Sequence, residues 1–386
     1  MSEATLREVV EALAPLRRAA GSDDERAAAE WLAERLTRAG ARAARVEDVP
    51  YRDGYARLYI PLNLLALFGG RLGALAAAAL IADDTSNYKR VWRRVASRPK
   101  PTTNVIAETG RPDAADTLVV LAHHDAAPTG VVFDQRAQRA FARRFPDVVA
   151  RTYTGLPLWW PVIGAPLLTV AGLKRTGRAV TLLTGLIGLD IARNRIVPGA
   201  NDNLSGVAAL VALAERGHDL PVRLLLVSCG AEEVLQGGIY PFVDDHLRAM
   251  DPQRTWVLNL DTIGSPELFM IEGEGILVME DYCAPAFRDQ VAAAAARAGV
   301  PLTRGCRARS STDAVIPSRA GYPTATLCSW EPATRCLSDY HLMTDVPERV
   351  DYATVAAAVA VAAALAEDLA STSSTRSATA ASTAST

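Results

Sequence analysis

The chain has almost no net charge. Its 386 residues include 41 basic and 43 acidic side chains, which leaves a formal charge of −2. This balance gives no overall electrostatic attraction to nucleic acid or to a strongly acidic partner. We therefore expect no nucleic-acid function, and any partner has to be inferred from local features of the sequence.

Cysteine is scarce, and the start of the chain does not resemble a secretion signal. The five cysteines are odd in number and scattered, at positions 229, 283, 306, 328 and 336. Residues 1–8 lack the basic-then-apolar order of an exported protein. We expect reduced thiols in a cytoplasmic protein, and a Cys328–Cys336 disulfide is the less favoured alternative.

Bulky apolar side chains are missing from residues 371–386, which are Ser, Thr and Ala with one Arg. Such a segment buries too little apolar surface to offset the entropy lost on ordering, so we expect it to be disordered. The preceding residues, 1–370, are long enough for one enlarged α/β domain with a sizeable core.

Charge is also missing from parts of two segments, residues 51–100 and 131–197. Leu58–Ala82 is apolar except for Asn63 and Arg71, and Thr152–Leu173 has no charged residue. By length alone each run could cross a membrane. However, Gly69-Gly70-Arg71 divides the first, and Lys174–Arg178 separates the second from another uncharged stretch. The apolar halves next to these breaks that are about eleven residues long are shorter than the ~20 residues that a membrane-spanning helix needs.

We expect each insertion to form an apolar helical hairpin that returns to its starting side. Single crossings would put His123 on the opposite side of a bilayer from the other candidate site residues. The sequence leaves two roles open for the hairpins. They could contact a membrane through 58–82 and 152–192, with the basic residues 89–94 near anionic head groups, or they could form a lid or a homodimer interface.

The rest of the chain alternates β-rich and helical patterns. Short apolar runs predict strands at 104–107, 117–122, 222–228, 256–260 and 324–328, and helical spacing predicts helices at 206–216, 239–249, 284–298 and 353–368. Two amphipathic helices are expected within residues 3–40. This order predicts a mixed, mostly parallel sheet flanked by helices, an α/β/α sandwich with two apolar helical insertions.

Histidines and carboxylates follow several of these strands. His123 closes the strand at 117–122, Glu232 and Glu233 follow the strand at 222–228, and Asp261 ends the strand at 256–260. Ligands of open α/β sheets gather at the carboxyl ends of strands. Two adjacent carboxylates repel each other unless a cation or a proton compensates them, and imidazole and carboxylate are ligands that zinc prefers.

Each of these residues also has an ordinary explanation when it is considered alone. Asp202, in the segment Gly-Ala-Asn-Asp-Asn-Leu-Ser-Gly (199–206), could cap the helix that begins near Ser205. Asp261 could cap a turn, and His341 could be a loop histidine. His124 should point to the other side of the chain and have a structural role, with a substrate contact as the less favoured alternative. It is improbable that every one of these explanations holds at once.

The ordered set His-x-Asp (123–125), residues 199–206, Glu232-Glu233, Asp261 and Tyr340-His341 resembles metallopeptidase family twenty-eight, the co-catalytic zinc aminopeptidases and their relatives. Thr312-Asp313 and the segment Gly321–Thr324 add to the resemblance. It covers about 101–130 and 198–368 and says nothing about the insertions.

The resemblance implies two zinc ions and a role for each matching residue. Asp202 would bridge the ions, His123 and Asp261 would complete one site, and Glu233 and His341 would complete the other. Glu232 would be the general base, and Asp125 would orient His123. Tyr340 could help to hold the oxyanion.

The implied function is a zinc-dependent exopeptidase, most simply an aminopeptidase that hydrolyses the N-terminal residue of a peptide substrate. Two alternatives remain open. One is a glutaminyl-peptide cyclotransferase, whose relatives work with one zinc. The other is a non-catalytic scaffold with the same fold. We also expect the insertion at 131–197 to cover the cleft.

Overall fold

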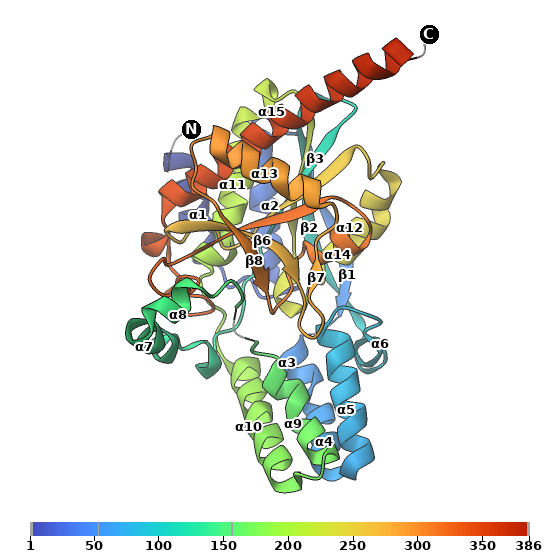
Figure 1. The fold of residues 1–386 in the computed structure, drawn as a ribbon, viewed down its shortest axis with the longest axis vertical. Helices are drawn as coiled ribbons and strands as arrows, with labels where there is room; N and C mark the ends of the chain where they lie inside the picture. The colour runs from blue at the N-terminus through green and yellow to red at the C-terminus, as the bar shows by residue number, and fades with distance from the viewer. Residues whose placement is uncertain (1–2, 53, 156, 384–386) are drawn as a thin grey trace.

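The computed structural model describes residues 3–52, 54–155 and 157–383, and Figure 1 shows its layered body with a group of helices projecting from one end. The described strands are β1 (Arg42–Arg52), β2 (Pro99–Gly110), β3 (Thr117–His123), β4 (Arg223–Cys229), β5 (Thr255–Leu260), β6 (Glu267–Glu274), β7 (Glu280–Asp281), β8 (Thr303–Ala308) and β9 (Thr324–Trp330). They form one sheet in the order β1-β2-β4-β3-β5-β9-β6-β7, with β8 paired to β6.

The centre of the sheet is parallel and its edges are mixed. Strands β4, β3, β5 and β9 pair in parallel, whereas β1 with β2, β2 with β4, β9 with β6, and β6 with β7 are antiparallel. The predicted mixed sheet is confirmed, and its parallel part lies where apolar runs were recognised. Strand β1 was not predicted because Pro50 and several charged residues interrupt its pattern, as suits an edge strand.

Helices cover both faces of the sheet. One face packs against α1 (Glu3–Leu13), α2 (Asp23–Arg38), α11 (Ser205–Arg216), α13 (Pro285–Arg297) and α15 (Tyr352–Thr383), and the other packs against α12 (Ile239–Asp245) and α14 (Val315–Arg319). Along β3, Leu118 and Val120 join the first core, whereas Val119 and Leu121 join the second. Because successive side chains of a strand point to opposite faces, this alternation establishes the predicted α/β/α sandwich.

The two insertions supply the projecting helices. The first forms α3 (Tyr55–Leu58), α4 (Ile60–Phe68), α5 (Gly70–Thr85) and α6 (Val91–Ala96), and the second forms α7 (Arg136–Arg144), α8 (Pro146–Ala150), α9 (Trp160–Val170) and α10 (Lys174–Arg193). Helices α4, α5, α9 and α10 lie side by side as a four-helix bundle, in which α4 and α5 meet at Gly69 (Figure 1).

Two details of the second insertion differ from the sequence-based expectation. The break falls at residues 171–173, and the Lys174–Arg178 cluster forms the first turns of α10 rather than the connection. Residues 160–170 are helical despite their prolines. Pro161 lies in the first turn, where the missing N–H has no intrahelical partner to lose, and Pro166 is buried inside the bundle, whose packing holds the helix together.

The end of the chain also differs from the expectation of a disordered tail. Helix α15 continues to Thr383, and residues 384–386 lie outside the described part of the chain. Alanine has the highest helix propensity of all residues, so the Ala-rich end can extend a helix that is already nucleated. The Tyr352–Ser371 part of α15 is long and apolar enough to cross a membrane by composition, but 56% of it is buried inside the protein.

A buried ion pair joins the first insertion to the body that contains the sheet. The Arg93 guanidinium on α6 donates to both carboxylate oxygens of Asp84 on α5, at 2.8 and 2.9 Å. Tyr59 donates its hydroxyl proton to the same carboxylate at 2.6 Å. Arg93 also donates to the carbonyls of Arg52 and Val234, at 3.0 and 3.2 Å. The guanidinium thus ties the base of the bundle to the loop beside Glu233.

We expect Arg93→Met to lower the free energy of unfolding by about 3 kcal/mol, because it leaves the Asp84 carboxylate buried without its main cation. Arg90, 3.6 Å from Asp84, limits the loss. Urea unfolding of the wild-type protein and of the Arg93→Met variant measures this loss of stability. The control is Arg94→Met on the same helix, where the side chain is exposed. Equal stability of both variants would contradict a structural role for the pair.

Candidate metal centre

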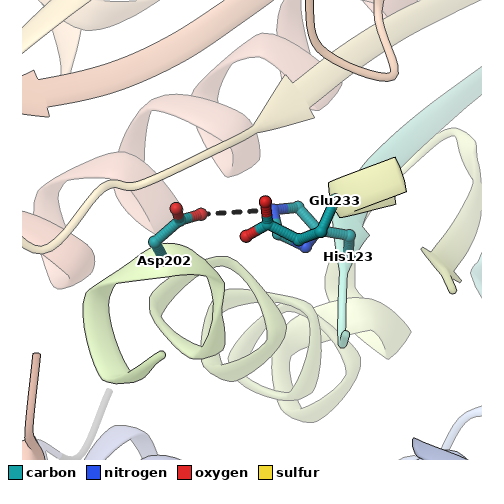
Figure 2. Close-up of side chains that lie close together, drawn as sticks. All are labelled: His123, Asp202 and Glu233. Carbon is teal, nitrogen blue, oxygen red and sulfur yellow. Dashed lines mark ion pairs between the residues drawn. The ribbon is translucent and has the colours of Figure 1, made fainter. Parts of the chain in front are cut away.

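The five predicted metal ligands come from separate loops at one edge of the sheet. His123 ends β3, Asp261 directly follows β5, and Glu233 lies in a short helical turn after β4. Asp202 lies in the segment that opens α11, and His341 lies in the loop after β9. Figure 2 shows His123, Asp202 and Glu233 facing one another, and their ligand atoms all lie within 4.8 Å of each other.

The Asp202 carboxylate lies between two imidazoles. One of its oxygens, Oδ1, is 3.3 Å from His123 Nε2, and the other, Oδ2, is 3.3 Å from His341 Nε2. Glu233 Oε2 is 3.1 Å from His341 Nε2. Two atoms that bond one zinc ion in tetrahedral geometry lie roughly 3.4 Å apart. The observed separations therefore fit a metal position on each side of Asp202.

Asp261 joins this group through a hydroxyl. Thr262 Oγ1 lies 2.9 Å from Asp261 Oδ1 and 3.3 Å from Asp202 Oδ1. Both carboxylates are buried, with 9% and 3% of their residue surfaces exposed. The structure thus brings His123, Asp202, Glu233 and His341 into direct contact and holds Asp261 beside them.

Asp125 contacts both the first histidine and the pair of glutamates. Its Oδ1 lies 3.4 Å from His123 Nδ1 and accepts a hydrogen bond from the Glu232 N–H at 3.0 Å. Its Oδ2 accepts from the Glu233 N–H, also at 3.0 Å. This one carboxylate therefore fixes the backbone of both glutamates, and it also lies behind the His123 imidazole.

Glu232 is held by a side chain that no sequence motif indicated. Gln236 Nε2 donates to Glu232 Oε1 at 2.8 Å and to the Ser311 carbonyl at the same distance. The Gln236 carbonyl oxygen accepts from Asn87 Nδ2 at 2.7 Å. Asn87 follows α5, so a chain of two amide hydrogen bonds connects the first insertion to the glutamate.

Two buried charges behind the site were also missed by the sequence analysis. Arg18, which is fully buried, donates to the carbonyls of Leu13, Leu16, His124, Pro198 and Gly199. Glu25 accepts from the Ala231 N–H at 3.0 Å and from Thr102 Oγ1 at 2.6 Å. Both residues fix loops that carry proposed ligands, and neither lies near a motif.

The backbone around the ligands is strained at three positions. Ala231, Thr262 and His341 have φ values of 54°, 54° and 55°, a region that residues with a β-carbon seldom adopt. His341 is a predicted ligand, and Ala231 and Thr262 are the chain neighbours of Glu232 and Asp261. Such outliers persist only where surrounding contacts hold them, and they concentrate at functional sites.

Aromatic side chains lie against His341. Tyr340 stacks on its ring with centroids 3.9 Å apart, and Phe133 packs edge-on at 4.4 Å. Phe133 belongs to the second insertion, so that segment reaches the predicted ligand His341. His124, in contrast, is removed from the group: its ring nitrogens contact Thr103 Oγ1 and Ser228 Oγ, and burial lowers its pKa to about 4. Its expected structural role agrees with these contacts.

Carboxyl groups dominate the interior of the site. Burial raises the pKa of Glu232 well above its usual range, and it also raises the pKa values of Glu233 and Asp261. Burial alone would lower the pKa of His341, but Glu233 and Asp202 raise it to about 10. The protein without metal therefore retains protons that a divalent cation would displace.

Several buried atoms also lack a partner among the described residues. They include Glu233 Oε1 and His341 Nδ1. Buried polar atoms are rarely left unsatisfied, and coordination of a cation is one of the ways in which such atoms are satisfied. The donor set, its separations and its uncompensated charge all fit zinc.

Solved structures with the same fold include both peptidases and cyclases. An aminopeptidase from Aneurinibacillus sp. strain AM-1 is 15% identical, with a TM-score of 0.56 over 95% of this chain and 93% of its own. A glutaminyl cyclase from Bacteroides thetaiotaomicron, bound to N-acetylhistamine, is 16% identical, with a TM-score of 0.57 over 95% and 97%. A zinc aminopeptidase from Bacillus subtilis is 14% identical, with a TM-score of 0.56 over 95% and 94%.

At these identities the likeness establishes the fold and leaves the reaction undecided. No curated protein matches the sequence. The profile of peptidase family M28 matches residues 186–366, which contain Asp202, Glu232, Glu233, Asp261 and His341. It leaves out residues 101–130, the other stretch of the expected resemblance. The family that the sequence motifs resemble is therefore the one whose profile matches residues 186–366.

Proposed function

We propose that this protein is a zinc-dependent aminopeptidase that uses two metal ions. The observation that carries the proposal is the position of Asp202, whose two carboxylate oxygens each face a different imidazole at 3.3 Å. A carboxylate with this arrangement is suited to bridge two metals. His123, Asp202 and Asp261 would hold one zinc, and Asp202, Glu233 and His341 would hold the other.

Zinc bound there would polarise the scissile carbonyl and acidify a water molecule. The protein's own residues supply proton transfer. Glu232 is buried and its pKa is raised, which makes its carboxylate a stronger base. Ionised beside bound cations, this carboxylate would accept a proton from water and, as the carboxylic acid, deliver that proton to the departing amine. The Gln236 amide holds Glu232 Oε1 and leaves the second oxygen for this transfer.

Asp125 would position two parts of this machinery at once. It accepts hydrogen bonds from the Glu232 and Glu233 backbones and lies behind His123. A carboxylate behind a metal-bound imidazole fixes the ring and strengthens it as a ligand. The proposed general base and one proposed ligand of each metal therefore share the same support.

Glutaminyl cyclisation is the second candidate, because solved cyclases share the fold as fully as aminopeptidases do. Two separate assays of the purified protein distinguish aminopeptidase from cyclase activity. One uses aminoacyl anilides, and the other uses peptides that begin with glutamine. Release of the anilide supports the proposal. Cyclisation without anilide release would replace it with the alternative, and neither activity in zinc-loaded protein would favour a scaffold.

We expect Glu232→Gln to retain zinc and to lose at least ~100-fold in kcat, the usual scale for a missing general base. Zinc content by mass spectrometry and steady-state hydrolysis measure the two effects. Glu331→Gln is the control, because Glu331 lies outside the proposed site and pairs with Arg139 at 2.7 Å. An unchanged kcat in Glu232→Gln would remove this residue from the mechanism.

We also expect the protein to bind two zinc ions per chain and to lose stability when a chelator removes them. Metal that binds only the folded state stabilises it, and here it also neutralises buried carboxylates. Thermal unfolding with and without chelator, followed by zinc addition, tests this. A Tm that does not respond to metal, or protein purified with a single tightly bound zinc, would count against the dimetal proposal.

A further inference from the structure

The four-helix bundle exposes many large apolar side chains. Phe68 and Leu72, beside the Gly69 break, are 79% and 83% exposed. The other exposed leucines of these helices are Leu64 and Leu65 on α4, Leu75 on α5, Leu167 on α9, and Leu182, Leu183 and Leu186 on α10. Contiguous apolar surface of this kind marks an interaction site.

The exposed residues concentrate on two neighbouring helices. Helices α4 and α10 touch where the Asn63 amide lies 3.5 Å from the position that a β-carbon on Gly185 would take. On either side of this contact lie Leu64, Leu65 and Phe68 of α4 and Leu182, Leu183 and Leu186 of α10. We call these six residues the α4–α10 face.

Basic residues extend the same face toward the tip of the bundle. On α10, Lys174, Arg178, Leu182 and Leu186 recur at intervals of four and therefore lie along one stripe of the helix, the two basic residues at its end. All four are exposed. Arg71 joins them from the other hairpin, since its guanidinium is 3.3 Å from the β-carbon position of Gly172.

Acidic residues are absent from these segments. Residues 54–82 and 152–189 contain five basic side chains, at positions 57, 71, 174, 175 and 178, and no Asp or Glu. The acidic residues of the bundle, Asp83, Asp84 and Asp190, lie near the C-terminal ends of α5 and α10, away from the tip. The whole chain is nearly neutral, so the tip of the bundle is a local concentration of positive charge. Its binding partner should therefore present an apolar region bordered by negative charge.

We propose that the α4–α10 face docks on a lipid bilayer that contains anionic lipids. A surface with exposed leucines and adjoining Lys and Arg matches the boundary between acyl chains and anionic head groups. Helix α4 has nine residues and is about 14 Å long, far less than a ~30 Å hydrocarbon core. The face lies along the membrane surface, with Lys174 and Arg178 reaching lipid phosphates.

A second copy of the chain fits this face less well. Pairing two such faces would bury apolar surface, but the acidic residues of the bundle are already engaged within the chain and are poorly placed to meet the basic residues of the other copy. Asp83 accepts from the Lys89 and Val91 N–H groups, Asp84 pairs with Arg93, and Asp190 accepts from the Val131 N–H and the Asn194 side chain. Anionic lipid head groups supply that missing charge. Bilayer docking would also place the metal centre within the bundle's length of the membrane, because Asn87 and Phe133 connect both insertions to it.

Vesicle flotation of the full-length, zinc-loaded protein tests the proposal. Vesicles of phosphatidylcholine alone are compared with vesicles of equal parts phosphatidylcholine and phosphatidylglycerol. We expect binding to the anionic vesicles only. The double change Leu182→Gln with Leu186→Gln should weaken binding at least about 10-fold through lost apolar contact. Lys174→Gln with Arg178→Gln should weaken it about 10-fold or more.

The opposite side of the bundle provides a matched control. Leu75→Gln with Leu167→Gln changes two exposed leucines on α5 and α9 and should leave binding within about two-fold, since the α4–α10 face is intact. Arg38→Gln with Arg111→Gln controls for total charge. Thermal unfolding confirms that each variant is folded, whatever its enzymatic activity.

Three results would overturn the proposal. The first is wild-type protein that ignores anionic vesicles, and the second is an equal loss of binding in the Leu75/Leu167 control. The third is a dimer, detected by light scattering, that Leu182→Gln with Leu186→Gln dissociates while vesicles remain unbound. That outcome would assign the face to a second copy of the chain.

Discussion

The site depends on the burial of several carboxylates in one small volume. Asp125, Asp202, Glu232 and Asp261 are all buried, and the two imidazoles beside Asp202 are the positive groups in contact with them. Like charges at such short range cannot all remain ionised in a low dielectric without cations. The fold therefore gives up stability at this edge of the sheet, and bound divalent metal is the physical means of recovering it.

Hydrogen bonds from buried side chains hold the loops around these carboxylates. Asp125 and Glu25 together accept from three consecutive backbone amides, those of Ala231, Glu232 and Glu233. Arg18 fixes the carbonyls of Pro198 and Gly199 just before the Asp202 segment. These contacts hold loops that would otherwise be separated by repulsion. The positive φ values at Ala231, Thr262 and His341 show that the loops are held away from relaxed conformations.

The sequence predicted the parts of this arrangement that have a repeating or ordered signal. The central strands were recognisable because both of their faces are buried, and the candidate ligands because they follow those strands in a known order. Gln236, Arg18 and Glu25 could not be found in this way. Arg18 and Glu25 act through contacts with residues far along the chain. Gln236 lies four positions from Glu232, but its amide is held in place by Ser311, which is 75 positions away. Strand β1 and the helical continuation of α15 were missed because their local composition is ambiguous.

The amide chain from Asn87 through Gln236 to Glu232 has a consequence for the boundaries of the protein. Asn87 is part of the first insertion, yet its side chain orients the glutamine that holds Glu232. Phe133 of the second insertion likewise packs on the His341 ring. A shortened version of this protein that preserves the candidate site must therefore keep both inserted segments. The bundle and the candidate metal site are thus structurally coupled, and a protein without these helices would need other side chains to provide the same support.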